Sequence, residues 1–299
     1  NVGTPTGVVA APIASAAAVP FIAPFTGAAK LRGEAGGPWV FHFRASYAQE
    51  IAALIGGLMD TCGLAADEIA FVTPRDAFGD ACFKIAAEEL RSRCGCDKLK
   101  VVHARFERNT LAMEGCVGEL LMTARPPRAV IVVAPHAPAA ELMRVARANG
   151  VNAEFLCVSF VGPDALAREL AGTGISAVAT LVTPPSEPRQ PVHARFEAAL
   201  AAIGRADRAD TVSLEGYIAG RMAVLALERA GPDPTRAKLR DALEGLGSFD
   251  LGLGTPLTLG SDRHQASDAV WPVRVADGVV RPIGWDRVLM RPAVTGAAP

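Results

Sequence analysis

The polar residues that come closest to a catalytic or metal-binding pattern lie near the carboxyl end of the chain. Asp262, Arg263, His264 and Gln265 are consecutive, and Asp268 follows three residues after them. Carboxylates beside a histidine are the groups that acid–base catalysis and metal binding use. The five histidines of the chain are far apart in sequence, however, and support no site on their own. We therefore interpret residues 262–268 as a polar turn before a strand.

A second candidate is Cys94-Gly95-Cys96, which has the spacing of half a metal site. No second close pair of Cys or His completes it, and His103 is the nearest histidine. The six cysteines of the chain permit disulfides, but their pairing does not follow from spacing. We expect partly buried thiols or a disulfide here, and the cysteines leave the cellular compartment open.

The motifs of common enzyme classes are absent from the sequence. It has no Walker A loop, no GxSxG, no HExxH and no Rossmann glycine fingerprint. Glu88 and Glu89 are expected on a solvated helix face. The sequence therefore predicts no enzyme, no cofactor and no bound metal.

Composition restricts the class of protein further. Half of the 299 residues are apolar, which is enough for two globular domains with full cores. The formal net charge of −1 gives no electrostatic footprint for nucleic acid. No apolar run approaches the roughly 20 residues of a membrane span. The Ala-rich start at residues 6–19 lacks a basic leading segment, so we interpret it as a buried helix and strand rather than a signal peptide.

Residues 68–90 form the clearest structural unit of the sequence. Residues 69–72 are an apolar run, as expected for a parallel strand that is covered on both faces. The next residues, 73–76, carry turn chemistry, and an amphipathic helix is predicted from Gly79 onward. In open α/β sheets, ligands bind beyond the carboxyl ends of strands. We therefore expect function at residues 73–79.

The same unit recurs along the chain. We predict strands centred near Phe71, Val102, Ile131, Leu156 and Val178, with helices at residues 79–93, 110–123, 139–149 and 164–170. This alternation indicates βαβ units and a parallel sheet. The turns at residues 135–138 and 160–163 would then lie at the same sheet edge as residues 73–79.

The two ends of the chain follow other patterns. We predict a helix at residues 8–18, strands at 20–23 and 40–43, and a helix that starts with a Ser46/Gln49 capping box. After a Pro-rich linker at residues 183–188, we predict helices at 192–203, 213–230 and 235–246. Residues 270–275 and 279–283 indicate a β-hairpin.

Several passages together resemble one family, in order and at matching spacing from Gly3 to about Trp285. They are similar to the type I periplasmic solute-binding proteins of the leucine/isoleucine/valine-binding kind, the receptors of ABC importers. The passages are GTPT (3–6), VPFIAPFTGAAKLR (19–32), FHFRASYAQE (41–50), RDAFGDA (75–81), VSFVGPDAL (158–166), LEGYIAGRMAVLAL (214–227) and SDRHQASDAVW (261–271).

This resemblance implies a two-lobed α/β fold with doubly wound, mostly parallel sheets and three inter-lobe crossings. The expected amino-terminal lobe comprises residues 1–66 and 187–250, and the carboxyl-terminal lobe comprises 67–186 and 251–290, followed by a tail at 291–299. The resemblance also implies that about the first hundred residues of such a protein are missing, so the amino-terminal lobe would be incomplete. Hinges are expected near residues 63–67, 183–188 and 247–254.

The resemblance also implies a ligand shell. Thr4 and Thr6 match a first loop, whose hydroxyl and backbone N–H groups take the ligand carboxylate. Phe25, Thr26 and Gly27 match a second loop, which offers backbone groups to the carboxylate and the ammonium. Ser159 matches a position that is acidic in leucine-type binders, and a buried ammonium without a carboxylate partner is costly, which argues against a simple branched-chain amino acid. Core packing remains an alternative for Phe25 and Phe78, and a strand-end hydroxyl for Ser159. The remaining shell positions are Phe78, an aromatic wall that is usually Tyr, with His136, Ala137 and Phe160.

By the same resemblance, the protein is expected to capture an amino acid or a similar small polar ligand between its lobes by hinge closure. Its partners would be that ligand and a membrane permease, without nucleic acid, and the protein would be a monomer on the periplasmic or extracellular side of the membrane. The alternatives are a ligand-sensing domain with the same fold and, with least support, an α/β enzyme.

Overall fold

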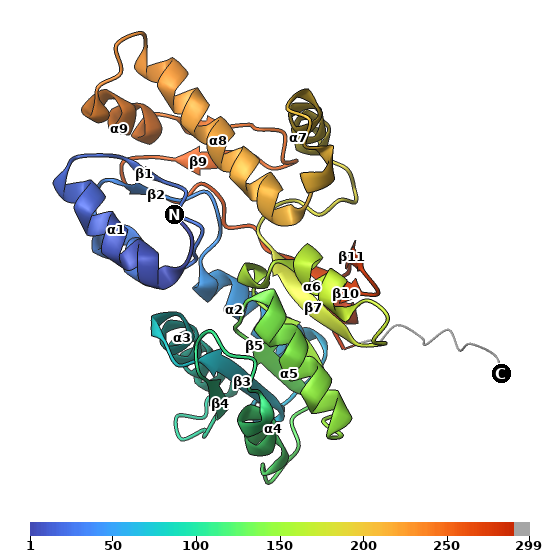
Figure 1. The fold of residues 1–299 in the computed structure, drawn as a ribbon. Helices are drawn as coiled ribbons and strands as arrows, with labels where there is room; N and C mark the ends of the chain where they lie inside the picture. Colours follow the sequence, from blue (N-terminus) through green and yellow to red (C-terminus); the bar gives the residue numbers. More distant parts are fainter. Residues whose placement is uncertain (290–299) are drawn as a thin grey trace. The chain divides into compact units, whose positions relative to one another are not determined.

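The computed structural model describes residues 1–289 and divides the chain into two compact units (Figure 1). Unit 1 comprises Asn1–Glu50 and Leu181–Trp271, and unit 2 comprises Ile51–Thr180 and the described residues from Pro272 onward. The chain therefore passes from one unit to the other three times, as predicted. The tail that we predicted at residues 291–299 lies outside the described residues.

Unit 2 is built on a seven-stranded sheet in the order β11-β10-β7-β6-β5-β3-β4. The pairs β3–β4, β3–β5, β5–β6 and β6–β7 are parallel, and β10–β11 is antiparallel. The mostly parallel sheet of the predicted fold class is thus confirmed. The strands are β3 (Ile69–Pro74), β4 (Val102–Phe106), β5 (Ala129–Val132), β6 (Glu154–Cys157), β7 (Ser176–Leu181), β10 (Trp271–Ala276) and β11 (Val279–Pro282).

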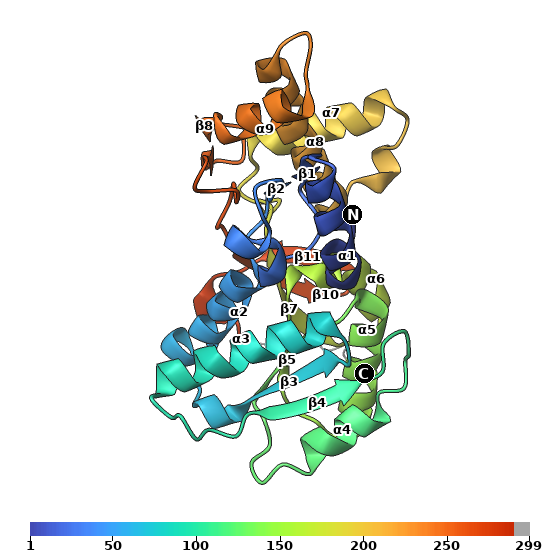
Figure 2. The ribbon, with the colours of Figure 1, turned by 90° about the vertical axis from the view of Figure 1, so that its left-hand side faces the viewer.

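Helices cover both faces of this sheet, which explains why its central strands are mostly apolar, with Thr73 and Glu154 as buried exceptions. All residues of β3, β5 and β6 are buried. Figure 2 shows α3 on one side of the sheet and α4, α5 and α6 on the other. The helices are α2 (Tyr47–Gly56), which continues as the π-helical turn Gly57–Thr61, α3 (Ala77–Cys94), α4 (Glu114–Leu121), α5 (His136–Ala148) and α6 (Pro163–Leu170).

The join between β3 and α3 shows how local sequence forms this unit. The Asp76 carboxylate accepts hydrogen bonds from the N–H groups of Phe78 (2.9 Å) and Gly79 (3.0 Å), so Asp76 is the N-cap of α3. A Cβ on Gly79 would collide with the carbonyl oxygen of Pro74. A capped helix start and a close approach of backbones therefore form the predicted strand–turn–helix. The helix ends at Gly95, which is left-handed with φ 63°.

Unit 1 carries shorter strands than unit 2. Strands β1 (Phe21–Ile22) and β2 (Val40–Phe41) pair in parallel, and β8 (Gly247–Phe249) and β9 (Leu257–Leu259) pair antiparallel. Its core gathers Phe41 and Phe43 with apolar residues of the three helices after the linker and with Leu251, Leu253, Leu257 and Leu259. The helices of unit 1 are α1 (Thr4–Ala16), α7 (Pro191–Ala202), α8 (Thr211–Ala230) and α9 (Arg236–Glu244). Across the described residues of both units, the 3₁₀ turns are Ala29–Leu31, Gly33–Ala35, Ala66–Glu68, Ser159–Val161, Ala206–Arg208 and Trp285–Arg287.

The unit boundaries differ from the predicted lobes at two of the three crossings. The second crossing, 180/181, lies close to the predicted linker at 183–188. The first crossing, 50/51, lies inside α2 rather than at the Gly-containing passage 63–67, because α2 runs through the boundary. The third crossing, 271/272, comes after the predicted passage 247–254, because residues 251–271 belong to unit 1. They are held there by backbone hydrogen bonds: Ala266 N–H donates to the His42 carbonyl (2.8 Å), and Ser267 N–H donates to the Phe43 carbonyl (2.9 Å).

The predicted hairpin at the end of the chain is present as β10 and β11. Asp277 (φ 47°) and Gly278 (φ 77°) are both left-handed, as a two-residue hairpin turn requires. Among the described residues, no helix combines the length and the apolar character that a membrane crossing needs.

Candidate functional site

Thr4 and Thr26, which the resemblance to a family assigned to two separate loops, meet in unit 1. Their hydroxyl oxygens lie 2.9 Å apart, and the two residues are 2% and 0% exposed. The backbone supports this meeting, because Gly3 N–H donates to the Phe25 carbonyl (3.1 Å) and Phe25 N–H to that of Asn1 (2.9 Å). Thr4 is also the first residue of α1, where free N–H groups and the helix dipole favour an anion.

Thr6 lies in the same turn of α1, but its hydroxyl is used within that turn. It donates toward the carbonyls of Gly3 (3.0 Å) and Val2. Thr6 is exposed, unlike Thr4. The structure therefore brings Thr4 and Thr26 into contact and leaves Thr6 on the surface of the helix.

Gly27 lies where the start of α2 packs on the loop at residues 25–27. A Cβ on Gly27 would lie 2.5 Å from the Tyr47 nitrogen, so only glycine fits. The Gly27 carbonyl accepts the Tyr47 N–H (2.9 Å), and the Thr26 hydroxyl accepts the Ala28 N–H (3.3 Å). Next to this contact, the predicted capping box is present: Gln49 N–H donates to the Ser46 hydroxyl (3.2 Å), and Ser46 N–H donates to the Gln49 side chain (2.7 Å).

Behind this loop lies a buried charge cluster that the sequence did not indicate. Arg44 is 1% exposed; it pairs with Glu50 (3.0 Å) and Glu215 (3.5 Å), and its guanidinium lies 5.0 Å from the centre of the Phe25 ring. Burial opposes the Arg44 charge, but the two carboxylates outweigh it and raise the pKa of Arg44 above its ordinary value. Burial raises the pKa of Glu215, and Arg44 opposes this shift. An arginine inside the apolar passage 40–47 is the one signal that could have revealed the cluster.

The predicted site residues of unit 2 lie beyond the carboxyl ends of three strands. Phe78 follows β3, His136 and Ala137 follow β5, and Ser159 and Phe160 follow β6. These strands are neighbours in the sheet, so the three turns share one edge. The rings of Phe78 and Phe160 meet edge to face, with centroids 4.9 Å apart. Ser159 is 5% exposed, and His136 and Ala137 are half-buried in the first turn of α5.

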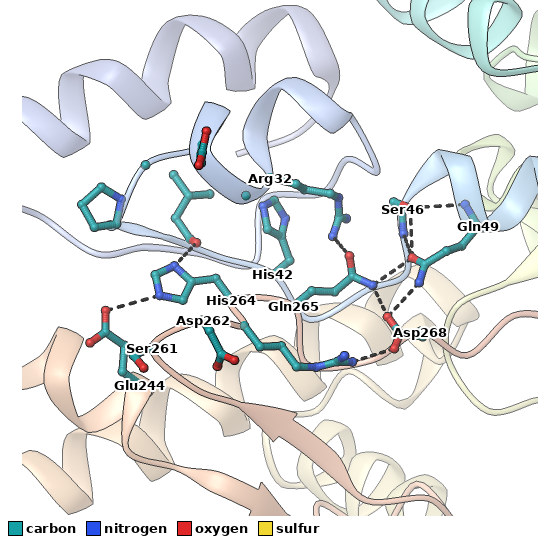
Figure 3. A pocket seen from close by; sticks show the side chains of 16 residues that line it. Arg32, His42, Ser46, Gln49, Glu244, Ser261, Asp262, His264, Gln265 and Asp268 are labelled. Carbon is teal, nitrogen blue, oxygen red and sulfur yellow. Dashed lines mark hydrogen bonds and ion pairs between the residues drawn. The ribbon is translucent and has the colours of Figure 1, made fainter. Parts of the chain in front are cut away.

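The polar residues 262–268 do form a turn before β10, but in unit 1 they also line a pocket of about 790 Å³ (Figure 3). The Gln265 amide donates to the Gln49 side chain (2.8 Å), and Arg263 binds the Asp268 carboxylate at 2.6 Å. The part that the sequence could not supply is the opposite wall, which comes from residues 32–49. Among the side chains drawn, the labelled ones are those of Arg32, His42, Ser46, Gln49, Glu244, Ser261, Asp262, His264, Gln265 and Asp268.

Burial and neighbouring charges shift the titration of this pocket wall. His42 is 1% exposed and donates from Nε2 to the Leu31 carbonyl (2.6 Å); burial and then Arg32 lower its pKa to about 3. Burial, with a contribution from Arg44, lowers the pKa of Arg32 to about 10. Burial alone would raise the pKa of Asp268, but hydrogen bonds from Arg263, Gln49 and Gln265 bring it below its ordinary value.

The six cysteines are free thiols in the structure, so the disulfide alternative for Cys94 and Cys96 is not observed. Within the described residues, no group of three or more His, Cys, Asp or Glu side chains is arranged to hold a metal ion.

Comparison with known proteins places these features in a family. The family model described as "Periplasmic binding protein" matches residues 1–279. A possible leucine/isoleucine/valine-binding protein from Rhodopirellula baltica SH 1 is 39% identical, with a TM-score of 0.90, over 97% of this chain and 77% of that one. A substrate-binding periplasmic protein from Ralstonia solanacearum is 29% identical, with a TM-score of 0.78, over 92% of this chain and 76% of that one.

A more distant likeness supports the fold alone. It is to a branched-chain amino acid ABC transporter protein from Thermus thermophilus with bound valine, which is 16% identical with a TM-score of 0.80 and covers 97% of this chain and 79% of that one. No curated protein sequence matches the chain. The family match over most of the chain and the 39% identical relative together show that this chain belongs to the periplasmic binding protein family, with the type I fold.

Proposed function

We propose that this protein is the solute-binding receptor of an ABC importer on the periplasmic or extracellular side of the membrane, and that it captures a small ligand with a carboxylate group. The observation that carries the proposal is the contact of Thr4 and Thr26, 2.9 Å apart at the start of α1. Hydroxyl groups and free N–H groups at a helix start are the donors that a carboxylate needs.

The edge of the unit 2 sheet supplies the other half of the proposed shell. Phe78 and Phe160 form an aromatic surface for an apolar part of the ligand, beside Ser159, His136 and Ala137. None of these five side chains is acidic, so a ligand ammonium would lack a carboxylate partner among them. The proposal therefore covers amino acids and similar small carboxylates, and it favours ligands whose other end is apolar over a simple branched-chain amino acid.

The proposed mechanism is closure of the two units around the ligand. A ligand that contacts both units binds the closed form better and shifts the equilibrium toward it. The closed form would then be the one that the membrane permease recognises. Catalysis has no place in this proposal, because the relatives at 39% and 29% identity are described as binding proteins.

The test is a thermal melt of the protein with a panel of compounds, followed by titration calorimetry. The panel contains L-leucine, L-valine, short-chain carboxylates, aromatic acids and the uncharged amide of each acid. A ligand at about 100 times its Kd should stabilise the protein by about 2.7 kcal/mol, while its amide should not. A cooperative melt that no acid shifts, or a shift that the amide reproduces, would contradict the proposal.

Two variants and a control locate the site. Thr26→Val removes a proposed carboxylate donor, and Phe160→Ala removes half of the aromatic pair; each should weaken binding of the active acid at least tenfold. Thr123→Val changes a threonine whose hydroxyl donates to the Leu120 carbonyl at the end of α4, and it should leave the Kd unchanged. Equal affinity of all three variants would place the site elsewhere.

A further inference from the structure

Arg32 connects the loop at residues 25–27 to the main chain that follows β2. Its Nη2 group donates to the carbonyl oxygens of Thr26 (3.4 Å), Arg44 (3.2 Å) and Ala45 (3.4 Å). One guanidinium group thus holds two backbone segments that have no ladder of strand hydrogen bonds between them at this point. Close to these contacts, the Tyr47 N–H donates to the Gly27 carbonyl and joins the same two stretches of chain.

The other side of the Arg32 guanidinium is held by the polar turn at residues 262–268. Its Nη1 group donates to the side-chain oxygen of Gln265. The Gln265 amide nitrogen donates to Gln49 (2.8 Å) and to the Ser267 carbonyl (3.1 Å), which orients the Gln265 oxygen toward Arg32. Figure 3 shows Arg32, Gln265, Gln49 and Asp268 directed toward one another.

Placing a positive charge at the position of Arg32 costs free energy. The groups that bind Arg32 are one amide oxygen and three main-chain carbonyls, all of them uncharged. Burial and the nearby Arg44 both lower its pKa, to about 10, so that Arg32 stays charged at neutral pH. A methionine of similar length would fill the space without this cost. The arrangement therefore provides something other than packing, namely one nitrogen that donates to the main-chain carbonyls and a second that binds Gln265.

We propose that Arg32 is a positioning residue: it holds the backbone of residues 25–27 in one conformation in the free protein, so that the Thr26 hydroxyl and the loop N–H groups are in place before ligand arrives. Arg32 itself does not contact the ligand. The claim that an ordered loop raises ligand affinity rests on the proposed function. The claim that Arg32 orders residues 25–27 does not rest on it. Preorganisation of this kind raises affinity because less ordering remains to be done on binding.

Amide hydrogen exchange of the ligand-free protein tests the proposal directly. The informative amides are those of Thr26, bonded to the Pro24 carbonyl (2.7 Å), Ala28, bonded to the Thr26 hydroxyl, and Tyr47, bonded to the Gly27 carbonyl. In Arg32→Met we expect these amides to exchange at least tenfold faster, while amides of β5 in unit 2 keep their wild-type rates. Arg32→Lys, which supplies one ammonium group in place of the two guanidinium nitrogens, should give an intermediate increase.

Two further variants separate the role of Arg32 from general changes in the pocket. Gln265→Met removes the acceptor that holds Arg32 and should raise loop exchange by a smaller factor, about threefold. Arg263→Met is the matched control: it removes an arginine of the same pocket that binds Asp268 but does not touch the loop, and loop exchange should stay within twofold of wild type. Gln265→Met and Arg32→Lys keep the test valid if Arg32→Met does not fold.

The outcomes distinguish this inference from the proposed function. Unchanged loop exchange in Arg32→Met and Arg32→Lys overturns the positioning role, and so does an increase spread evenly over α8 and β1. If loop exchange rises as expected and L-leucine binds the wild-type protein, Arg32→Met should weaken that binding at least tenfold. Loop exchange that rises while no acid of the panel binds overturns the proposed function and leaves the positioning role supported.

Discussion

The Oγ1 atoms of Thr4 and Thr26 lie 2.9 Å apart in the interior of unit 1, at the start of α1. The two residues are 22 positions apart in the sequence, and the rest of α1 and all of β1 lie between them. The hydrogen bond between them therefore joins two loops that only the fold brings together. It also means that a ligand carboxylate placed there would meet two hydroxyls that already orient each other.

This pair predicts a non-additive loss of stability. Thr4→Val removes the hydroxyl partner of Thr26, and Thr26→Val removes the partner of both the Thr4 hydroxyl and the Ala28 N–H, so each should lower the free energy of unfolding by about 1–3 kcal/mol. The double variant should lose less than the sum of the two, because it leaves no orphaned hydroxyl. Urea unfolding measures all three, with the exposed Thr6→Val as control. Losses that add to within about 0.3 kcal/mol would show that the two hydroxyls do not interact.

The buried cluster around Arg44 should dominate the stability of unit 1. Arg44→Met leaves the Glu50 and Glu215 carboxylates buried without their cation, so we expect a loss of about 3–5 kcal/mol in the free energy of unfolding. Adding Glu50→Gln and Glu215→Gln should recover part of that loss. Arg189→Met breaks an exposed pair with Glu197 and should cost less than about 1 kcal/mol. Similar midpoints for Arg44→Met and Arg189→Met in urea would refute the expectation.

Burial of His42 predicts a fall in stability with acidity. The pKa of His42 is about 3 in the folded protein against 6.5 for the ordinary side chain, so the unfolded chain binds the extra proton between these values. The stabilisation is complete above pH 6.5 and is lost as the pH falls toward 3; by pH 4.5 the loss is about 2–3 kcal/mol.

The measurement for His42 is the free energy of unfolding at several pH values between 7.5 and 4.5. His42→Gln keeps a donor for the Leu31 carbonyl and removes the titrating group, so its stability should fall less steeply. Some slope should remain, because burial also lowers the pKa of His103, to about 4. Parallel curves for His42→Gln and the wild type would mean that His42 does not carry the effect.

Two glycines should respond to alanine in opposite directions. A Cβ on Gly79 would collide with the Pro74 carbonyl at the start of α3, so Gly79→Ala should destabilise the protein by about 2 kcal/mol or more. Gly118 lies inside α4 with open space where a Cβ would be, so Gly118→Ala should stabilise it by about 0.5–1 kcal/mol. Thermal melts of both variants provide the check, and a stabilised Gly79→Ala would disprove the close packing of β3 and α3.

The sequence determined most of unit 2, because the information there is local. An apolar run such as residues 69–72, followed at once by turn residues, indicates a strand that is covered on both faces, and Asp76 and Gly79 mark the helix that follows. Repetition of that unit predicted the parallel sheet, and the sheet then placed Phe78, His136 and Ser159 at one edge. The run at residues 20–23 and the alternation at 40–43 predicted the two short parallel strands of unit 1, and the resemblance to a family supplied the loop residues beside them.

Only the tertiary structure decided what surrounds those loops. The polar turn at residues 262–268 reads as an exposed turn because its partners, Arg32 and Gln49, lie 233 and 216 residues away from Gln265 in sequence. The buried position of Arg44 likewise depends on Glu215, a residue of α8 that pairs with Arg44 only in the folded chain. Hydrogen bonds and ion pairs act over a few ångströms of space, and the sequence records no such proximity between distant segments, so these contacts emerge only when the chain has folded.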